Sequence, residues 1–565
     1  MGVATALLLV GAYSTEIADT DFWWHLRTGQ YVVEEATLPA PDPFSYTWDL
    51  GEEDYPGERR VRSFNLTHEW LSQAIWYCIY AVGGFGALVL WKALLLAFAA
   101  GASGLFVLRR TRSATAAAGA ALLSAPTFVY FAADRPALLT FALVPGFILL
   151  LERFFDGESD RELWALVPLQ WFWANSHGGF FLGWVVLGAY FLRSLRGLDP
   201  GRRKRFWIIA GAAVAVSGLN PNGFRVVEVL IAYRQSSLTK TLIEWKAPPL
   251  WGPPYVFQAL LYAAAAVLAF SWRRVVFSDA LLFAAFAVAA LTALRNITLI
   301  AFLAPALIFS YAWPELARRF PRLAGPAPAY VLFALVAGSS AYLVTHGSLF
   351  QLRVAEWKFP VGAARFLAEN KPPGKMFNSY EYGGYLIWAL GPEQQTFVDG
   401  RALNEGVFRD YRTLLYGGGQ NIEESRAVRS KLYEKYDIGY VAMNSFEYVV
   451  GTLYPLVLDL ADRANRDWAL VYSDAQAVVF VRRAPENREW LRGRTIPKAR
   501  VAEHLVSSCR TYVEHSPDLP NCARTLGMLL MQMDQRDPAR NAFELYRRHY
   551  PYADPEVDRL LSELR

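Results

Sequence analysis

Two aspartates and two tryptophans follow the first apolar run of the chain, in the segment DTDFWWHLRTG (19–29). A carboxylate costs about 2.5–3.5 kcal/mol at the centre of a bilayer and less near its surface. Asp19 and Asp21 therefore suit a membrane-edge site where a general base takes a proton and the substrate is partly lipid. The indole faces of Trp23 and Trp24 would contact a sugar ring there. The alternative is a solvated loop with both tryptophans as interface anchors.

Further polar residues recur in the connectors between later apolar runs. They are Asp42, His68, Glu69, Asp134, Arg135, His177, Glu244, Arg295, Asn296, Asp399 and Arg401. Arg295 has no acidic residue within ten positions, so an external anion is one partner for it, as for Arg135. An ion pair with a loop aspartate is the other. For Glu244, Asp399 and Arg401, structural caps and turns are the alternative to a role in the site.

Histidines raise the question of a metal. With Asp19 or Asp21, the side chains of His25, His68 and His177 offer ligands for a divalent cation such as Mg or Mn. Their scatter along the sequence has no metal-site spacing, however. Ordinary hydrogen-bonded histidines are the alternative, and the sequence indicates no other cofactor.

Membrane helices are the elements that must position these residues. Of the 565 residues, 54% are hydrophobic and only 19% charged, and the chain is too long for one soluble core. Many apolar runs reach or approach the length that crosses about 30 Å of hydrocarbon. We expect about eleven spans, at 2–14, 84–108, 114–132, 136–152, 162–174, 178–195, 206–219, 256–271, 280–294, 297–313 and 327–345. The first run lacks a basic n-region, so we expect a span and not a cleaved signal.

Basic residues gather in every second connector. The clusters lie near positions 109, 193, 271 and 315, which the positive-inside rule assigns to the cytoplasm. The polar candidates above then share the extracytoplasmic side. This distribution accounts for the net charge of +5 without nucleic-acid binding.

Three parts follow along the chain. Residues 1–345 form the predicted membrane domain, with a first extracytoplasmic loop at 15–83. Residues 346–485 alternate short apolar runs with amphipathic stretches, a pattern typical of a small α/β domain, which eleven spans would place outside the cytoplasm. Residues 486–565 favour a helical tail resembling one tetratricopeptide unit, which must pack on the α/β domain or bind a partner protein.

Three cysteines, Cys78, Cys509 and Cys522, are too few and too scattered for a structural zinc site. Cys509 and Cys522 lie on consecutive amphipathic stretches joined by a turn. We expect them to pair in an oxidising compartment. Two ordinary buried cysteines are the alternative.

A series of motifs carries a family resemblance over about residues 1–485. DTDFWWHLRTG, DPFSYT, HEWLSQ, NSHGGF, NPNG, IEW and YGGYLIW with VDGR, in that order, resemble a bacterial family of polytopic proteins related to the GT-C glycosyltransferases. That superfamily includes protein O-mannosyltransferases, aminoarabinose transferases and oligosaccharyltransferases. The resemblance implies acidic catalytic positions at Asp21, Asp19 and Asp134. The segment around Tyr382, NSYEYGGYLIW, is similar to the acceptor-binding motif of oligosaccharyltransferases without its paired tryptophans.

The sequence thus predicts a multi-span α-helical, GT-C-like protein of the bacterial inner membrane. The expected activity is hexosyl or pentosyl transfer from a polyprenyl-phosphate donor to an extracytoplasmic protein, glycan or lipid. A non-catalytic membrane scaffold that docks a partner through its tail is the alternative from another class. A transporter fits less well, because the charges gather at one membrane face and not at the midplane.

Overall fold

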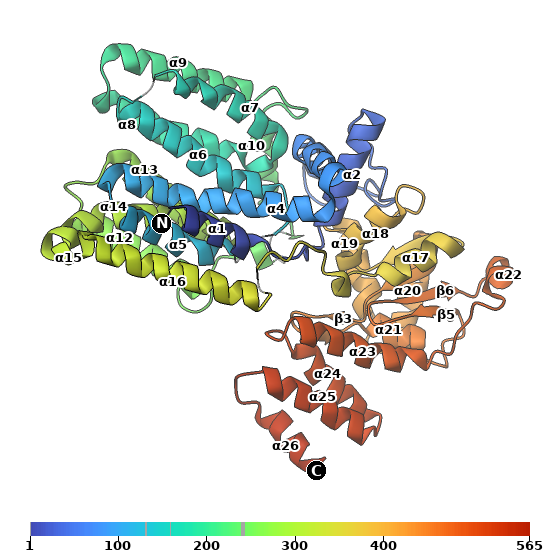
Figure 1. Ribbon diagram of the computed structural model, residues 1–565. Helices are drawn as coiled ribbons and strands as arrows, with labels where there is room; N and C mark the ends of the chain where they lie inside the picture. The colour runs from blue at the N-terminus through green and yellow to red at the C-terminus, as the bar shows by residue number, and fades with distance from the viewer. Residues whose placement is uncertain (1, 130–132, 159, 239–242, 348, 565) are drawn as a thin grey trace. The chain divides into compact units, whose positions relative to one another are not determined.

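The computed structural model describes residues 2–129, 133–158, 160–238, 243–347 and 349–564 (Figure 1). The chain divides into two compact units. The first unit comprises Met1–Asp19, Thr28–Ala40 and Tyr55–Val354, and the second comprises Thr20–Arg27, Pro41–Asp54 and Ala355–Arg565. The second unit therefore takes in two pieces of the predicted first loop 15–83. It also keeps the predicted α/β domain and tail together.

The first unit is built from helices. They are α1 (Gly2–Tyr13), α3 (Glu58–Thr67), α4 (Trp70–Thr111), α5 (Ala114–Val129), α6 (Ala137–Phe155), α7 (Leu166–Ser176), α8 (Phe181–Gly197), α9 (Pro200–Val216), α10 (Val226–Ala232), α12 (Tyr255–Phe270), α13 (Phe277–Thr292), α14 (Thr298–Arg319), α15 (Pro321–Ala324) and α16 (Pro326–Thr345). Helix α2 (Phe22–Glu35) begins in the second unit and ends in the first. Helix α4 packs along α1, α5, α6 and α14.

All eleven predicted apolar runs fall on helices, although 130–132 of the third run lie outside the described residues. Within the described residues, five helical stretches are long and apolar enough to cross a membrane: Glu58–Thr111, Ala137–Phe155, Gly178–Gly197, Leu294–Arg319 and Ala327–Thr345. Four shorter apolar helices accompany them, at Gly2–Tyr13, Ala114–Phe128, Tyr255–Phe270 and Phe277–Thr292. These helices indicate an integral membrane protein, while eleven crossings stay a prediction.

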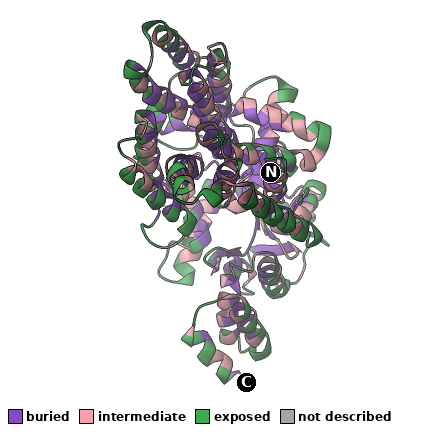
Figure 2. Cartoon of the chain, turned by 60° about the vertical axis from the view of Figure 1, so that its left-hand side comes forward, coloured by how far each residue is buried: buried purple, intermediate pink, exposed green. Residues whose placement is uncertain are grey.

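Helix α4 shows how the apolar surface is divided. One face carries Leu90, Leu94, Phe98, Leu105 and Leu108, which are 36–56% exposed. The other face packs inside the unit, and the same division into buried and exposed faces is visible across the helices in Figure 2. Soluble proteins rarely expose so continuous an apolar stripe. Contact with lipid chains accounts for it.

A buried ionic cluster ties five helices of the first unit together. Arg110 of α4 pairs with Glu152 of α6 at 2.7 Å and with Asp279 of α13 at 2.5 Å. Arg193 of α8 pairs with the same Glu152 at 2.5 Å. The hydroxyl of Tyr311 in α14 donates to Asp279 at 2.6 Å. The two cations and two anions balance, which offsets part of the cost of burying them.

The second unit contains a four-stranded sheet in the order β1-β2-β6-β5. Strands β1 (Lys375–Asn378) and β2 (Ile438–Met443) are parallel, whereas β2 and β5 (Trp468–Ser473) each run antiparallel to β6 (Val478–Arg482). All six residues of β2 are buried, as a continuous apolar run predicts for a central strand. Strands β3 (Phe446–Glu447) and β4 (Thr452–Leu453) form a separate pair.

Helices surround this sheet and continue into the tail. They are α17 (Val361–Asn370), α18 (Tyr380–Leu390), α19 (Glu405–Tyr416), α20 (Ile422–Lys435), α21 (Pro455–Ala461), α22 (Arg488–Leu491), α23 (Arg500–His515), α24 (Asn521–Gln532), α25 (Arg536–His549) and α26 (Pro555–Glu563). Cys509 of α23 and Leu526 of α24 share one buried cluster with Val441 and Phe480 of the sheet. The tail thus packs on the sheet, one of its two predicted supports.

Cys509 and Cys522 form a disulfide with their Cα atoms 5.7 Å apart, as the sequence predicts. The cysteines are 13 residues apart, and closing so short a loop contributes about 3 kcal/mol in the chain-entropy model. We expect the double change Cys509→Ser, Cys522→Ser to lower the thermal unfolding midpoint of the second unit. Differential scanning calorimetry would measure it. Cys78 is free and exposed, so Cys78→Ser is the matched control, and equal midpoints for both variants would contradict the expectation.

Candidate functional site

The first unit contains a cavity of about 410 Å³ that is lined by both polar and apolar side chains. Its polar lining includes Asn65, His68, Glu69, Arg135, Thr140, His177, Tyr233, Glu244, Arg295 and Asn296. Its apolar lining includes Phe64, Phe141, Phe181, Leu182, Val226, Val229, Leu230, Trp245 and Leu299. Seven of the residues singled out from the sequence therefore meet here, although they come from five separate segments of the chain.

Two arginines face one carboxylate across this cavity. Nη1 of Arg135 lies 3.6 Å from Oε2 of Glu244, and Nη1 of Arg295 lies 3.6 Å from Oε1. These separations exceed those of a direct charge-assisted hydrogen bond. Within the described residues, Arg295 makes no side-chain hydrogen bond, and its guanidinium carbon lies 4.7 Å from the ring centre of Trp245. Arg295 thus keeps hydrogen-bonding capacity for a ligand oxyanion.

Asp19 and Asp134 are each held by a cation of the first unit. Arg135 donates from Nε to Asp19 at 2.6 Å and from Nη2 at 3.1 Å. Lys92 lies 2.9 Å from Asp134 and also donates to the carbonyl of Thr15 at 3.0 Å. Burial raises the pKa of Asp134 to about 6, although Lys92 opposes the shift. Both aspartates are therefore engaged in ion pairs, which lowers the ability of Asp19 to accept a proton.

His177 is fixed in one tautomer by its neighbours. The backbone N–H of Gly179 donates to its Nδ1 at 3.0 Å, and the Thr140 hydroxyl lies 2.7 Å from the same nitrogen. That hydroxyl accepts from Trp173, so its own proton points to Nδ1. Burial lowers the pKa of His177 to about 4. The ring is therefore neutral, with its proton on Nε2.

Glu69 lies between the two histidines of the cavity. Its Oε1 is 3.3 Å from Nε2 of His68 and 3.7 Å from Nε2 of His177. Nδ1 of His68 donates to the carbonyl of Phe64 at 2.9 Å. Within the described residues, no three His, Cys, Asp or Glu side chains form a group that could hold a metal ion. Mg or Mn accordingly stays a prediction from the sequence.

Asp21 and its aromatic neighbours belong to the second unit. The carboxylate of Asp21 lies against Gly400, where an added Cβ would approach Oδ1 to 1.6 Å. The ring of Trp23 packs edge-on against Tyr385 at 4.8 Å, and Trp24 stacks near His25 at 3.5 Å. Trp23 is 2% exposed and Trp24 7% exposed.

The burial of these tryptophans corrects both interpretations drawn from the sequence. Their faces are covered by protein side chains, so neither indole is an interface anchor or an open platform for a sugar. Hydropathy could not show this, because the rings that cover Trp23 lie more than 300 residues away in the sequence.

Arg401 joins two carboxylates inside the second unit. It lies 2.9 Å from Asp42 and 2.7 Å from Asp399, and the three side chains are at most 3% exposed. Burial raises the pKa of Asp42, while Arg401 acts in the opposite direction. The group carries one cation for two carboxylates. Its complete enclosure favours the structural alternative for Asp399 and Arg401.

A second cavity, of about 200 Å³, lies in the second unit around Glu381 and Tyr382. The Tyr382 hydroxyl donates to the carbonyl of Gln476 at 2.6 Å. Oε1 of Glu381 accepts from Tyr454 at 3.0 Å, whereas its buried Oε2 has no hydrogen-bond partner among the described residues. Burial raises the pKa of Glu381. Sequence reasoning missed Glu381, although its place next to Tyr382 in NSYEYGGYLIW was a usable signal.

Sequence reasoning also missed Asn65 and Gly179, which line the first cavity, and Lys92, which is not part of its lining but pairs with Asp134. Lys92 lies inside an apolar run, and the hydropathy of that run does not show which residue pairs with it. Asn65 accepts from the Tyr233 hydroxyl at 2.7 Å. Gly179 has no room for a side chain, because a Cβ would lie 2.8 Å from Nδ1 of His177.

Comparison with known proteins links this fold to one group of solved structures. No protein-family profile and no curated protein matches the chain. The structure is similar to the archaeal oligosaccharyltransferase AglB from Archaeoglobus fulgidus in complex with an inhibitory peptide and a dolichol-phosphate. That match has a TM-score of 0.53 and 13% identity, and it covers 86% of this chain and 74% of the other. The apo form of the Archaeoglobus fulgidus oligosaccharyltransferase matches over the same shares, with a TM-score of 0.50 and 14% identity. At this identity the likeness shows a common fold.

Proposed function

We propose that the chain is a GT-C-type glycosyltransferase of the membrane that moves a sugar from a polyprenyl-phosphate donor to an extracytoplasmic acceptor. The observation that carries the proposal is the cavity of the first unit, whose lining combines Arg135 and Arg295 with many apolar side chains. Such a cavity suits a ligand with an anionic phosphate and a lipid chain. The fold shared with AglB, which was solved with a dolichol-phosphate and a peptide, supports the same class of substrate.

The proposed reaction assigns a role to each charged group. The resemblance implies Asp21 as the base that takes the proton of the acceptor hydroxyl or amide as the acceptor atom attacks the anomeric carbon. The bond from that carbon to the phosphate oxygen breaks, and the leaving phosphate keeps the electron pair. Arg135 and Arg295 stabilise its charge, and the phosphate displaces Glu244 from their guanidinium groups. Glu69, His68, His177 and Asn296 bind the sugar or the phosphate by hydrogen bonds.

The acceptor side of the proposal rests on the second cavity. Its segment NSYEYGGYLIW resembles the acceptor-binding motif of oligosaccharyltransferases, and Glu381 offers a buried carboxyl oxygen without a partner among the described residues. We propose that Glu381 and Tyr382 contact the acceptor. A protein, a glycan or a lipid remains eligible.

An assay in proteoliposomes tests the proposal directly. The purified chain would be reconstituted with radiolabelled polyprenyl-phosphate sugars and a membrane extract as a source of acceptors. Transfer of label from the lipid fraction to an acceptor fraction supports the enzyme. Binding of the lipid-linked sugar without transfer under any acceptor condition would instead support the non-catalytic scaffold.

Arg295→Lys tests the phosphate site. Lysine keeps the charge but loses the planar fork that binds two phosphate oxygens, so we expect donor affinity to fall by about tenfold, the lower range for a charge-assisted hydrogen bond. Acceptor affinity should change less. Titration of the proteoliposomes with donor and acceptor separates the two effects. Arg274→Lys, an exposed change away from the cavity, is the control, and equal losses for donor and acceptor would favour a structural ion pair.

Topology has its own test. We propose eleven crossings in the bacterial inner membrane, with the second unit outside the cytoplasm, a placement that the disulfide Cys509–Cys522 supports. Reporter fusions at positions near 200 and 320 should report a cytoplasmic location, and fusions near 235 and 400 an outer one. A cytoplasmic result near 400 would contradict the placement.

A further inference from the structure

The second unit also has a basic surface hollow, which shares no lining residue with the cavity around Glu381 and Tyr382. The hollow has a volume of about 580 Å³ and is lined by Arg463, Arg466, Arg483 and Lys498 around Trp468. The three arginines are exposed, whereas Trp468 is 3% exposed and forms part of the floor. Four cations thus surround one surface hollow.

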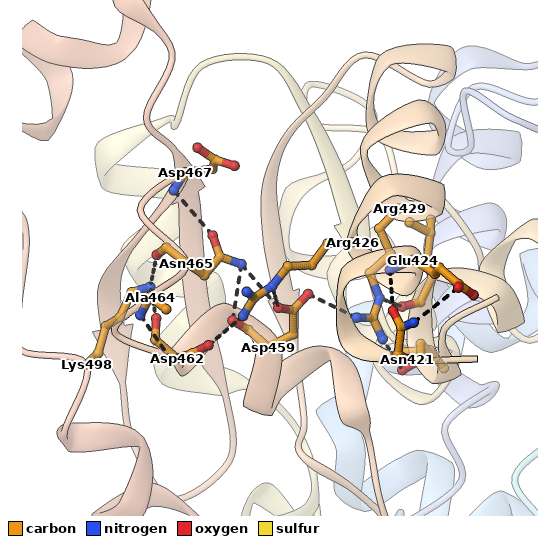
Figure 3. A network of polar contacts seen from close by, with 12 residues as sticks. Asn421, Glu424, Arg426, Arg429, Asp459, Asp462, Ala464, Asn465, Asp467 and Lys498 are labelled. Carbon is orange, nitrogen blue, oxygen red and sulfur yellow. Dashed lines mark hydrogen bonds and ion pairs between the residues drawn. The ribbon is translucent and has the colours of Figure 1, made fainter. Parts of the chain in front are cut away.

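Asp462 and Asp459, two carboxylates whose charges act on Lys498, are engaged by other arginines, as Figure 3 shows. Asp462 pairs with Arg426 at 2.5 Å, and Asp459 pairs with Arg426 at 2.5 Å and with Arg429 at 2.9 Å. Among the described residues, Arg463, Arg466 and Arg483 have no ion-pair or side-chain hydrogen-bond partner. The carboxylate of Asp467 forms no ion pair within the described residues either. Most of the positive charge in the hollow is therefore uncompensated.

Lys498 is a fixed part of the hollow. Its Nζ donates to the carbonyls of Asp462 at 2.9 Å and Asn465 at 2.6 Å, which holds the loop before α23 against the loop before β5. Burial lowers the pKa of Lys498, and the charge of Arg483 lowers it further. The neighbouring first turn of α23 adds the positive end of a 16-residue helix. The helix terminus favours an anion in the hollow, whereas the lowered pKa of Lys498 shows that its own positive charge is costly there without one.

We propose that this hollow binds the phosphate or diphosphate group of a ligand. Three arginines offer planar, fork-shaped donors that match phosphate oxygens, and the lysine adds a positioned charge. The hollow is also large enough for a ligand of small-molecule size. The phosphate can belong to a lipid headgroup or to a soluble compound, since both present the same oxygens.

Calorimetric titration of the full chain with inorganic pyrophosphate tests the proposal. The protein would be held in nanodiscs of neutral phosphatidylcholine at low salt. The test variant is Arg463→Gln with Arg483→Gln. The control is Arg488→Gln with Arg492→Gln, which removes the same charge from exposed arginines outside the hollow. We expect the test variant to bind pyrophosphate at least tenfold more weakly than the wild type and the control to stay within about twofold, because charge-assisted hydrogen bonds are individually strong.

Equal weakening in both variants, or no binding by the wild type, would overturn the proposal, because general charge attraction would then be the whole effect. Nanodiscs containing phosphatidylglycerol identify the source of the phosphate. If the headgroup occupies the hollow, these discs should weaken pyrophosphate binding to the wild type and the control much more than to the test variant. If a soluble ligand is the natural occupant, the same change of lipid should affect the wild type, control and test variant alike. A failure of sugar transfer in the proteoliposome assay would leave this result unaffected.

Discussion

Replacing Asp21 with asparagine is expected to reduce sugar transfer by about 100- to 10,000-fold, the usual contribution of a general base. Asparagine keeps the volume that fits against Gly400 but removes the basic oxygen. The resemblance indicates three acidic positions, of which Asp19 and Asp134 pair with Arg135 and Lys92, and we propose Asp21 as the base. Initial rates in the proteoliposome assay would measure the loss.

Two companion variants separate chemistry from folding. Asp518→Asn, an exposed change in the same unit, should transfer sugar at the wild-type rate. Asp19→Asn should lose less activity than Asp21→Asn, because its carboxylate serves the ion pair with Arg135. Asp21→Asn and Asp518→Asn should keep the wild-type unfolding midpoint. Normal activity in Asp21→Asn would remove this residue from the proposed mechanism.

The parts of the fold that were predictable are those fixed by local sequence. An apolar run longer than a dozen residues forms a helix wherever it lies, so all eleven runs were found. The pairing of Cys509 with Cys522 was also accessible, because the two helices are joined by a short turn. The number of membrane crossings depends on helix lengths and on the surrounding bilayer, and the sequence settles neither.

The candidate site was predictable as a set of residues but not as an arrangement. Arg295 was expected to meet either an external anion or a loop aspartate, and the structure gives it Glu244 at 3.6 Å. Asp19 and Asp21 looked like a pair, yet they group with different units. Such outcomes depend on contacts between segments far apart in the sequence, as with Arg295 and Glu244, for which hydropathy and periodicity hold no information.

Arg401→Gln should destabilise the second unit more than any other single change considered for this chain. The substitution leaves Asp42 and Asp399 buried without their cation, and breaking a buried ion pair in this way costs about 3–5 kcal/mol. The fully enclosed side chains cannot turn to water, because they are at most 3% exposed. Thermal unfolding followed by circular dichroism would report the loss as a lower midpoint.

An exposed ion pair provides the control for Arg401→Gln, and the pH dependence of stability provides a second test. Arg409→Gln breaks an ion pair with Asp54 in which the arginine is 67% exposed, and such pairs contribute only about 0–1 kcal/mol. Its midpoint should stay close to that of the wild type.

Burial raises the pKa of Asp42 in the folded chain. The folded state therefore binds more protons than the unfolded state above the unfolded pKa of about 3.9. Stability from this group therefore falls as pH rises towards the folded pKa. Without Arg401 the effect should grow, and Arg401→Gln should lose less stability at pH 5 than at pH 8. A loss that is independent of pH, or one no larger than that of Arg409→Gln, would show that the buried charge is compensated by another group.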